Sequence, residues 1–533
     1  MHTSKINQES KPVRKLIVLG GGSAGWMSAA FLNHALGKQV QVCLVESPTI
    51  GRIGVGEATL PTIKEDFFDF LGIPESEWMP ACKATFKMGI KFMNWLKSPE
   101  EGGDKYYHCF GEIPSIGEVP LSHILYKKWA EEGGVALDKS CYTSPHYCER
   151  HLAPKMSDGR KVEHYAYHID AQLVADFLRD RSVERGVEHI YDNIVHVHLN
   201  EEGNIGWLVG ENGDKYEAEM YVDCTGFTGA LLGKALGEPW IDFNDTLLTD
   251  SAVAINIPGN PKAEQIRPYT SATGMKHGWL WETPLFGRTG NGYVYSSQFV
   301  SQEDAEAELR QHFGERAEGR DVRHIRFRTG RRRRSWVKNC VGIGLASSFL
   351  EPLESTGLYF VYAALHQFIR HFPSGDVNPV HRKAFNERVS YMVEDVKDFI
   401  IMHFITAGRK DTPFWRAAKE VKIPDSLQEI LDKQKAGLPI KMSYHGNKSL
   451  YSTFESSFDR FWTNSNYQAV LAGVNYLPDE ILPILNLRPD LMQKGELQLE
   501  KIRKEVRHRL ASLPTHYDFL KGIHQPKEVE QVS

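Results

Sequence analysis

Two glutamates stand three residues apart in the stretch SSFLEPLESTGLYF, among residues that are otherwise apolar or carry hydroxyl groups. They are Glu351 and Glu354, and Pro352 lies between them. A purely structural interpretation is available, because proline and glutamate favour the first turn of a helix and the spacing from Ser348 to Glu351 fits a capping box. Motifs this short match by chance, so whether a carboxylate here does chemistry depends on the rest of the chain.

Three lysines follow one another at intervals of four in the stretch ACKATFKMGIKFMNW, at positions 83, 87 and 91. In a helix they would form a solvated face. In a strand, which FKMGIKF favours, Lys87 and Lys91 would share one face and the apolar residues the other. A lysine on an inward face would be desolvated, and its amine would become available for chemistry. The sequence leaves both interpretations open.

Two tryptophans, Trp279 and Trp281, stand two residues apart in HGWLWETPLFGRTGNGYVYSS. In a strand both point to one face, and a packed aromatic layer is the structural interpretation of that spacing. Pro284 cannot donate a ladder hydrogen bond, so it limits this strand to an edge or an end.

A glycine motif opens the chain's first predicted helix. LGGGSAGWMSA has Gly20, Gly22 and Gly25 in GxGxxG spacing, directly after a predicted strand, and Glu46 ends the next strand. The glycines let the backbone approach a pyrophosphate, the helix start favours its charge, and the acid can bind ribose hydroxyls. Strand, helix and acid in register predict dinucleotide binding. The position near the amino end, and a later YVDCTGFTG that closes a strand, favour FAD over NAD.

A second full GxGxxG for a nicotinamide cofactor is not evident in the sequence. A flavin bound here must therefore be reduced by a substrate, or reduced flavin must arrive from another protein.

Composition excludes several classes of function. The chain has 533 residues, 41% hydrophobic and 25% charged, with a net charge of −5, which offers no broad cationic surface for nucleic acid. Seven cysteines without a CxxC pair argue against a disulfide framework and against a metal site. The polar amino end and the lack of a run of about 20 apolar residues predict no membrane segment, and we expect a cytoplasmic protein.

The order of elements predicts an α/β fold. Residues 15–19 and 39–45 are predicted strands around a helix at 24–36, another helix is expected at 171–186, short strands fill roughly 250–345, and helices follow residue 356. We expect a Rossmann-like FAD-binding body with an inserted β-rich layer at 15–375 and a helical carboxy-terminal cap over the substrate at 376–524. Residues 1–14 and 525–533 are expected to be loose tails.

The motifs together resemble one family. GGGSAGWMSA, RIGVGEAT, FKMGIKFMNW, GWLWETPL and FLEPLESTG are similar, in this order and over nearly the whole chain, to the flavin-dependent tryptophan halogenases. GWLWETPL is similar to the family's WxWxIP signature, although Thr283 replaces the usual isoleucine.

The resemblance implies a halogenase that takes FADH2 from a separate flavin reductase and uses O2 and chloride or bromide to make hypohalous acid. This oxidant would cross an internal tunnel to a lysine, which by the motif FK is Lys87. The amine would either form a haloamine or hold the acid by a hydrogen bond, and the sequence does not choose between them.

The second glutamate matches the family's catalytic carboxylate. An ionised Glu354 would stabilise the cationic arenium intermediate and accept the proton that leaves the ring. Ser355, Thr356 and Gly357 would turn toward the flavin, and the backbone N–H groups of Thr356 and Gly357 would bind halide. The resemblance implies contacts to the flavin from Gly20, Gly22, Ser23, Ala24, Gly25, Glu46, Gly56, Glu57, Ala58, Leu345, Gly357 and Leu358.

The resemblance also implies an aromatic sandwich around an indole ring, with Trp279 and Trp281 between flavin and substrate. Its expected substrate contacts are His108, Phe110, Trp279, Trp281, Tyr451, Phe461, Trp462 and Asn466.

One part of the family's substrate site is missing from this sequence. Relatives hold the amino acid with a tyrosine pair and a glutamate, where this chain has Leu450, Tyr451 and Ser457, with Glu455 nearby. Without the glutamate a buried ammonium would lack its partner, which costs several kcal/mol. We therefore rank a free indole or other indolic compound first, free tryptophan second and a larger tryptophan-bearing ligand third. The ring position and the choice of halide stay open.

Two other classes of function remain as alternatives. A flavin monooxygenase that hydroxylates an aromatic ring would use the same FAD body, but it needs no relay amine such as Lys87. A flavin-binding protein without catalytic activity is the third hypothesis. A homodimer is expected by analogy with the family alone.

Overall fold

A parallel sheet forms around the glycine motif. The computed structural model describes residues 12–51, 56–134, 136–259, 262, 266–441 and 461–525. In it, β1 (Lys15–Leu19), α1 (Ser23–Leu36) and β2 (Gln41–Glu46) form the expected βαβ unit. Four parallel pairings join β10 (Glu188–Tyr191), β2, β1, β14 (Met220–Asp223) and β23 (Cys340–Gly342), and β22 (Trp336–Val337) adds an antiparallel edge. The Rossmann-like body is confirmed.

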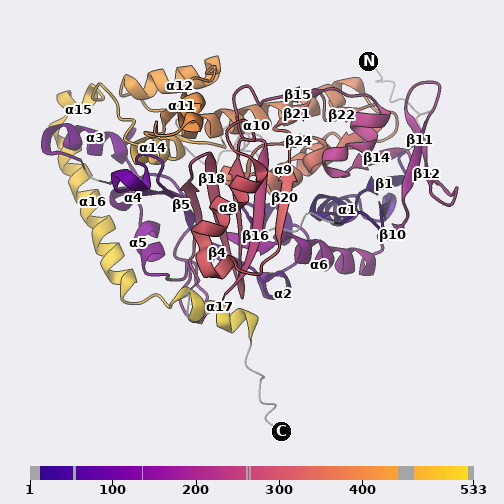
Figure 1. The fold of residues 1–533 in the computed structure, drawn as a ribbon, viewed down its shortest axis with the longest axis horizontal. Helices are drawn as coiled ribbons and strands as arrows, with labels where there is room; N and C mark the ends of the chain where they lie inside the picture. The colour runs from indigo at the N-terminus through magenta and orange to yellow at the C-terminus, as the bar shows by residue number, and fades with distance from the viewer. Residues whose placement is uncertain are drawn as a thin grey trace, which may run out of the picture.

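The strand β1 shows why this sheet lies inside the protein. Leu16 and Val18 belong to one hydrophobic core, and Ile17 and Leu19 belong to another on the opposite face. A parallel sheet that is covered on both faces needs such an unbroken apolar strand, which KLIVL supplies. Helices α6 (Ala171–Glu184) and α9 (Gly357–Arg370) pack with α1 on one side of the sheet, so the start of α9 is brought near the glycine motif (Figure 1).

A seven-stranded sheet fills the middle of the molecule (Figure 1). Its order is β20 (Val322–Arg326), β16 (Ser251–Pro258), β19 (Arg288–Tyr295), β18 (Gly278–Leu285), β17 (Thr270–Gly274), β5 (Gly89–Met93) and β6 (Lys105–Cys109). Only β17 and β5 run parallel. The expected β-rich layer is confirmed.

The tryptophan strand β18 is central in this sheet and not at its edge. Pro284 is its penultimate residue and pairs with Thr289 of β19, whereas the pairing with β17 already ends at Glu282. The missing N–H of Pro284 therefore lies beyond the β17 ladder. Of the two positions predicted for Pro284, an edge or an end of a strand, the structure shows the end.

The lysine segment forms two strands that belong to different sheets. Lys87 ends β4 (Thr85–Lys87), which pairs with β9 (Ala166–Asp170), and β9 also pairs with β3 (Gly56–Ala58). Lys91 lies in β5, and the Met88 N–H donates to the Pro268 carbonyl oxygen at the break between the strands. The segment is therefore extended and the helix is excluded, but Lys87 and Lys91 lie in strands of different sheets and do not share one face of a single strand.

Smaller elements complete the body. They are β7 (Ser115–Ile116), β8 (Val119–Pro120), β11 (Ile194–Leu199), β12 (Ile205–Gly210), β13 (Lys215–Glu217), β15 (Trp240–Asp242), β21 (Gly330–Arg332), β24 (Ser348–Phe349), α2 (Glu75–Ala81), α3 (Leu121–Glu132), α4 (Leu137–Cys141), α5 (Ser144–Glu149) and α8 (Gln302–Phe313). A one-turn 3₁₀ helix, η8 (Pro352–Glu354), carries the acid motif.

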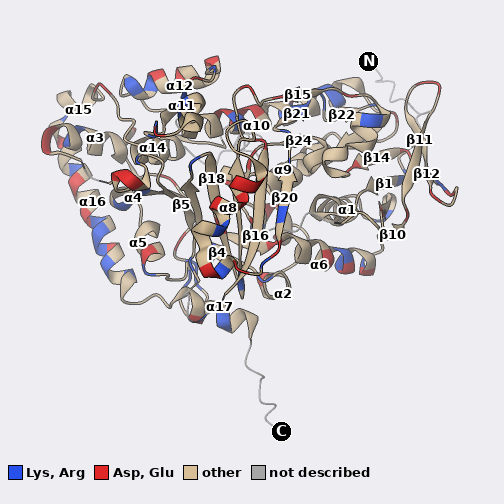
Figure 2. Ribbon diagram, in the orientation of Figure 1, with Lys and Arg blue, Asp and Glu red and all other residues tan. Residues whose placement is uncertain are grey.

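The described residues after 356, which are 357–441 and 461–525, are mostly helical, as expected. After α9 come α10 (Pro379–Thr406), α11 (Pro413–Lys419), α12 (Asp425–Lys435), α14 (Asn464–Gly473), α15 (Ile484–Leu487), α16 (Pro489–Leu510) and α17 (His516–His524). Figure 2 shows that α16 and α6 carry bands of both charges, while the central strands are mostly uncharged. Among the described residues, no helix is both long and apolar enough to cross a membrane.

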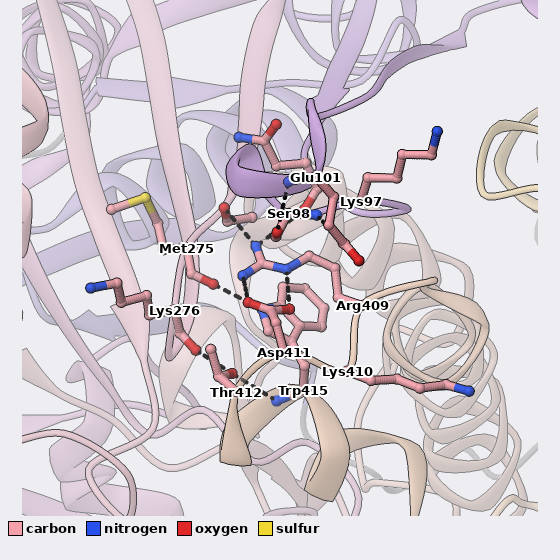
Figure 3. Close-up of polar contacts among 12 residues, drawn as sticks. Lys97, Ser98, Glu101, Met275, Lys276, Arg409, Lys410, Asp411, Thr412 and Trp415 are labelled. Atoms are coloured by element: carbon pink, nitrogen blue, oxygen red, sulfur yellow. Dashed lines mark hydrogen bonds and ion pairs between the residues drawn. The ribbon is translucent and has the colours of Figure 1, made fainter.

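A buried arginine fastens the end of α10 to the central sheet. Arg409 is 2% exposed and follows the last residue of α10 by three positions. Its guanidinium forms a two-point ion pair with Asp411 and donates to the carbonyl oxygens of Asn94 and Gly274, next to the ends of β5 and β17. It also lies over the Trp415 ring (Figure 3). This bidentate geometry positions the last turn of α10 against the two strands.

The carboxy-terminal helix α17 fastens the lysine strand in a similar way. His516 is fully buried, and its Nε2 accepts a hydrogen bond from the Phe86 N–H at 3.1 Å while Nδ1 donates to the Ile266 carbonyl oxygen. Burial lowers the pKa of His516 to about 3, so the imidazole is neutral and can accept. The strand that presents Lys87 is thus held by a residue 430 positions later.

Candidate active site

Lys87 points into the protein interior. Its side chain has no exposed surface. Nζ donates to the Thr59 carbonyl oxygen at 3.2 Å and to the Ser355 hydroxyl at 2.9 Å, and it lies 5.3 Å from the centre of the Phe110 ring. One amine therefore contacts the segment after β3, the acid motif and an expected wall of the substrate site.

The amine of Lys87 is close to its titration midpoint at neutral pH. Burial lowers its pKa to about 7, and the charge of Glu354 opposes part of that shift. The free amine is a nucleophile toward electrophilic halogen, and the ammonium is a hydrogen-bond donor. Both chemical interpretations of the lysine are therefore accessible in one pH range.

Ser355 links the lysine to the acid motif, a contact that the sequence did not predict. Its backbone is in the left-handed region, with φ 61°, at the end of η8. A non-glycine residue there costs about 1 kcal/mol or more. This conformation places the Ser355 hydroxyl against Lys87 directly beside Glu354.

Glu354 is held by two histidines. It is 1% exposed, and its Oε2 lies 2.9 Å from Nδ1 of His108, while its Oε1 lies 2.9 Å from Nε2 of His403. Burial raises the pKa of Glu354, but the interactions with His108 and His403 outweigh burial and bring it down to about 2. The carboxylate is therefore ionised although it is buried.

His403 was not predicted as a site residue. It lies in the stretch FIIMHFIT near the end of α10, where one histidine among apolar residues gives no sequence signal beyond a buried helix face. Only the fold shows that this helix passes Glu354.

Glu351 has a different environment from Glu354. It is fully buried, and its Oε2 accepts a hydrogen bond from Trp279 Nε1 at 2.7 Å. Burial raises the pKa of Glu351 to about 7. No side chain caps η8, so the capping box from Ser348 to Glu351 is absent, whereas Pro352 and Glu354 do lie in the first turn of a short helix, as the structural interpretation predicted. Two acids three residues apart have pKa values shifted in opposite directions, an arrangement typical of sites with distinct acid roles.

Several expected substrate residues gather around Glu354. Rings of His108 and Trp462 lie 5.9 Å apart, and Trp462 stacks on Phe399 at 4.0 Å. Phe461 stacks on Tyr359 at 4.3 Å. The rings of Trp279 and Trp281 are 6.4 Å apart, with both side chains buried.

Asn466 contacts a neighbouring side chain. Its Nδ2 lies 3.0 Å from Nε2 of His108, and its Oδ1 accepts from Thr463 at the start of α14. Tyr451, together with Leu450, Glu455 and Ser457, lies outside the described residues.

The glycine motif fits a dinucleotide. A Cβ on Gly25 would lie 1.8 Å from the Gly20 carbonyl oxygen, so this glycine is required for packing, whereas a Cβ on Gly22 would meet nothing within 4 Å. Gly22 is the N-cap of α1, and no side chain caps the helix. The first turn of α1 therefore has no side-chain cap and begins beside open space, as a bound pyrophosphate requires.

Other expected flavin contacts lie around this helix start. A Cβ on Gly21 would collide with the Glu46 carboxylate, so the acid lies over the glycine turn, and His189 Nε2 is 2.8 Å from its Oε1. Gly56, Glu57 and Ala58 form β3, and Leu345 lies in a 3₁₀ turn at Gly344–Ala346. The first four residues of the motif RIGVGEAT, 52–55, lie outside the described residues.

The expected halide position is at the start of α9. Gly357 is the first residue of that helix, Thr356 is its N-cap, no side chain caps it, and Leu358 follows as a buried residue. A Cβ on Gly357 would meet nothing within 4 Å. Uncapped N–H groups at a helix start next to open space fit a small anion.

Known proteins share this sequence and fold. The family model described as tryptophan halogenase matches residues 15–490. Tryptophan 7-halogenase RebH of Lentzea aerocolonigenes is 42% identical, covering 97% of this chain and 99% of RebH. The crystal structure of tryptophan 6-halogenase SttH from Streptomyces toxytricini has a TM-score of 0.87 at 38% identity, covering 95% of this chain and 99% of SttH. Tar14, a tryptophan C-6 flavin-dependent halogenase from taromycin biosynthesis, has a TM-score of 0.87 at 36% identity, covering 96% and 99%.

The fold and the site define a nucleotide-binding α/β enzyme with a buried lysine beside an ionised carboxylate. The chain belongs to the tryptophan halogenase family, and it is a flavin-dependent halogenase. The expected family is confirmed, and the comparisons do not favour the monooxygenase.

Proposed function

We propose that this halogenase installs chlorine or bromine on an indole ring, with Lys87 presenting the halogen and Glu354 accepting the ring proton. Reduced FAD, delivered by a separate reductase, supplies hypohalous acid from O2 and halide when it is bound. The observation that carries the proposal is the buried contact of Lys87 with Ser355, directly beside the ionised Glu354.

The chemistry of these residues is complementary. Electrophilic halogenation makes the ring cationic, and the buried carboxylate of Glu354 lowers the energy of that cation. The C–H bond then breaks, its electron pair restores the aromatic ring, and the proton bonds to the carboxylate. Phe110 beneath Lys87 and the rings around Trp462 exclude water from the oxidant.

For the halide we propose the N–H groups of Thr356 and Gly357, and for the flavin the glycine motif with Glu46, β3 and the start of α9. The uncapped first turns of α1 and α9 support this assignment.

The substrate is proposed as an indolic compound, with a free indole ahead of free tryptophan. The ring walls support an aromatic guest, whereas Ser457 stands where relatives carry the glutamate that binds an ammonium. The relatives named for ring position 7 and those named for ring position 6 have similar sequence identity to this chain. Sequence identity therefore does not indicate which ring position is halogenated.

The test is incubation with FADH2, O2, chloride or bromide and a panel of indoles and tryptophan, read by mass spectrometry for halogen isotope patterns. We expect halogenated product from the wild type and none from Lys87→Ala, with flavin oxidation unchanged. Lys83→Asn is the matched control, because Lys83 is exposed with φ 48°, a conformation that asparagine tolerates. Halogenation by Lys87→Ala near the wild-type rate would remove the lysine from the mechanism.

A further inference from the structure

The carboxylate of Glu354 meets two imidazoles whose hydrogen atoms can be assigned from their other partners. One is His108 on β6 and the other is His403 on α10, and all three side chains are at most 4% exposed. Each imidazole nitrogen either donates or accepts, so the second partner of each ring decides what it offers to Glu354.

The contact with Asn466 shows which ring nitrogen of His108 carries a hydrogen. Oδ1 of Asn466 accepts from the Thr463 N–H at 2.9 Å, which fixes the amide so that Nδ2 donates to Nε2 of His108 at 3.0 Å. Nε2 of His108 is therefore an acceptor, and Nδ1 carries the hydrogen that it donates to Glu354 at 2.9 Å. His108 is a neutral donor.

His403 is different. Its Nδ1 lies 2.8 Å from the Phe399 carbonyl oxygen, which can only accept, so Nδ1 carries a hydrogen. In a neutral ring Nε2 would then be bare, only 2.9 Å from Glu354 Oε1. Nε2 has no aligned hydrogen-bond partner among the described residues, so its contact with the carboxylate is a contact between charges. A bare nitrogen and a carboxylate oxygen this close repel in a site without solvent, whereas an imidazolium and a carboxylate attract.

The surroundings favour a neutral pair over an isolated charge. The ring of His403 is fully buried, and its centre lies 5.1 Å from that of Phe92 and 5.0 Å from that of Phe399. The titratable groups that face this pair are His108 and Tyr106 from β6 and Lys87 from β4. A lone carboxylate among these aromatic rings would be costly, and an imidazolium beside it balances its charge.

We propose that His403 carries a second proton and forms a charge-balanced carboxylate–imidazolium ion pair with Glu354, in which His403 is the positioning residue of the proposed base. The catalytic part of this inference rests on the proposed function. His403 holds Oε1 by the ion pair, and Oε2 keeps a lone pair that takes the proton released from the ring. The imidazolium keeps both of its protons during that step.

The first experiment needs no catalytic activity. Protein labelled with ¹⁵N-histidine is examined by NMR, and the ring signals that disappear in His403→Gln are assigned to His403 among the 22 histidines. We expect both nitrogens of His403 to show the shifts of a protonated imidazolium at pH 8, and to become those of a neutral ring in Glu354→Gln. A bare Nε2 in the wild type would overturn the proposal.

His123 is the matched internal control. It is 2% exposed, its Nε2 accepts from Gln468 at 3.1 Å, and burial lowers its pKa to about 4. Its ring must show one bare nitrogen at pH 8 in all three proteins.

The second experiment separates positioning from simple packing. Glutamine at position 403 can still donate to Glu354, but it brings no charge, so the carboxylate should protonate at higher pH. Lys87 already sets the expected acid limb of kcat near pH 7, so the carboxyl is followed directly. We expect the ¹³C signal of the Glu354 carboxyl to titrate at least one pH unit higher in His403→Gln, with KM changed less than about threefold. A carboxyl signal that titrates at the same pH in both proteins would contradict the proposal. If no indole is halogenated at all, the proposed function fails, while the NMR result still shows whether His403 is an imidazolium.

Discussion

The nucleotide-binding side and the substrate side of this enzyme are built in different ways. Around α1 the site consists of backbone, with glycines and uncapped N–H groups that lie within a few residues of each other. Around Glu354 it consists of side chains, and the pairs that touch are 246 and 358 residues apart in sequence. The first kind of site can be read from a motif, and the second exists only in the folded chain.

The largest expected effect disturbs the substrate side alone. Glu354→Gln keeps the shape but removes the charge that stabilises the cationic ring and the base that takes its proton. We expect kcat for halogenation to fall about 10²–10⁴-fold, while FAD binding stays unchanged in a fluorescence titration. A variant with full activity would show that no carboxylate is needed.

The next largest effect is a difference in pH dependence between halogenation, which uses the substrate side, and FAD binding, which uses the nucleotide-binding side. Lys87, with a pKa of about 7, is mostly protonated below that value. If the free amine is the reactive form, initial halogenation rates should fall about tenfold per pH unit below 7 and level off above it. FAD affinity, held by backbone groups, should stay flat over the same range. A rate that rises toward pH 6 would instead favour the ammonium as the donor that holds hypohalous acid.

A smaller effect is expected from a substitution on the nucleotide-binding side. Gly22→Ala places a methyl group in the open space before α1 without meeting protein atoms. We expect FAD to bind about fivefold more weakly, which is about 1 kcal/mol, with an unchanged Tm. The control is Gly522→Ala in α17, where the added Cβ also meets nothing within 4 Å. Equal FAD affinity of both variants would mean that the cofactor does not approach Gly22.

The smallest effect concerns stability and not activity. The pKa of His516 is about 3 in the folded protein, against an ordinary histidine value of 6.5, so the unfolded chain binds the proton more readily between these values. The stability that His516 contributes is therefore present above pH 6.5 and is lost as the pH falls toward 3. We expect Tm to drop less steeply between pH 6.5 and 4.5 in His516→Gln than in the wild type. Parallel curves would show that this histidine does not drive the acid loss.

Sequence predicted the parts that depend on local pattern. KLIVL and the glycines gave the βαβ unit, and the alternation around Lys87 gave a strand, because both follow from side-chain period and backbone sterics. Pro284 was predicted at an edge or an end of a strand, and sequence could not choose between them, because the choice depends on where the β17 ladder ends.

The partners of Glu354 could not be predicted in the same way. His403 lies in an apolar helix, and Asn466 contacts His108 only because α14 packs beside β6. The left-handed turn at Ser355 gives no signal in a motif that otherwise resembles a helix cap. Each of these features depends on tertiary packing and not on propensity.

The hydrogen bond from Phe86 to His516 has a consequence during biosynthesis. At about 5–20 residues per second, a growing chain waits on the order of half a minute between making the lysine strand and making the histidine that secures it. Until then the strand that carries Lys87 lacks this hydrogen bond, so the lysine is fully positioned only after nearly the whole chain has been made.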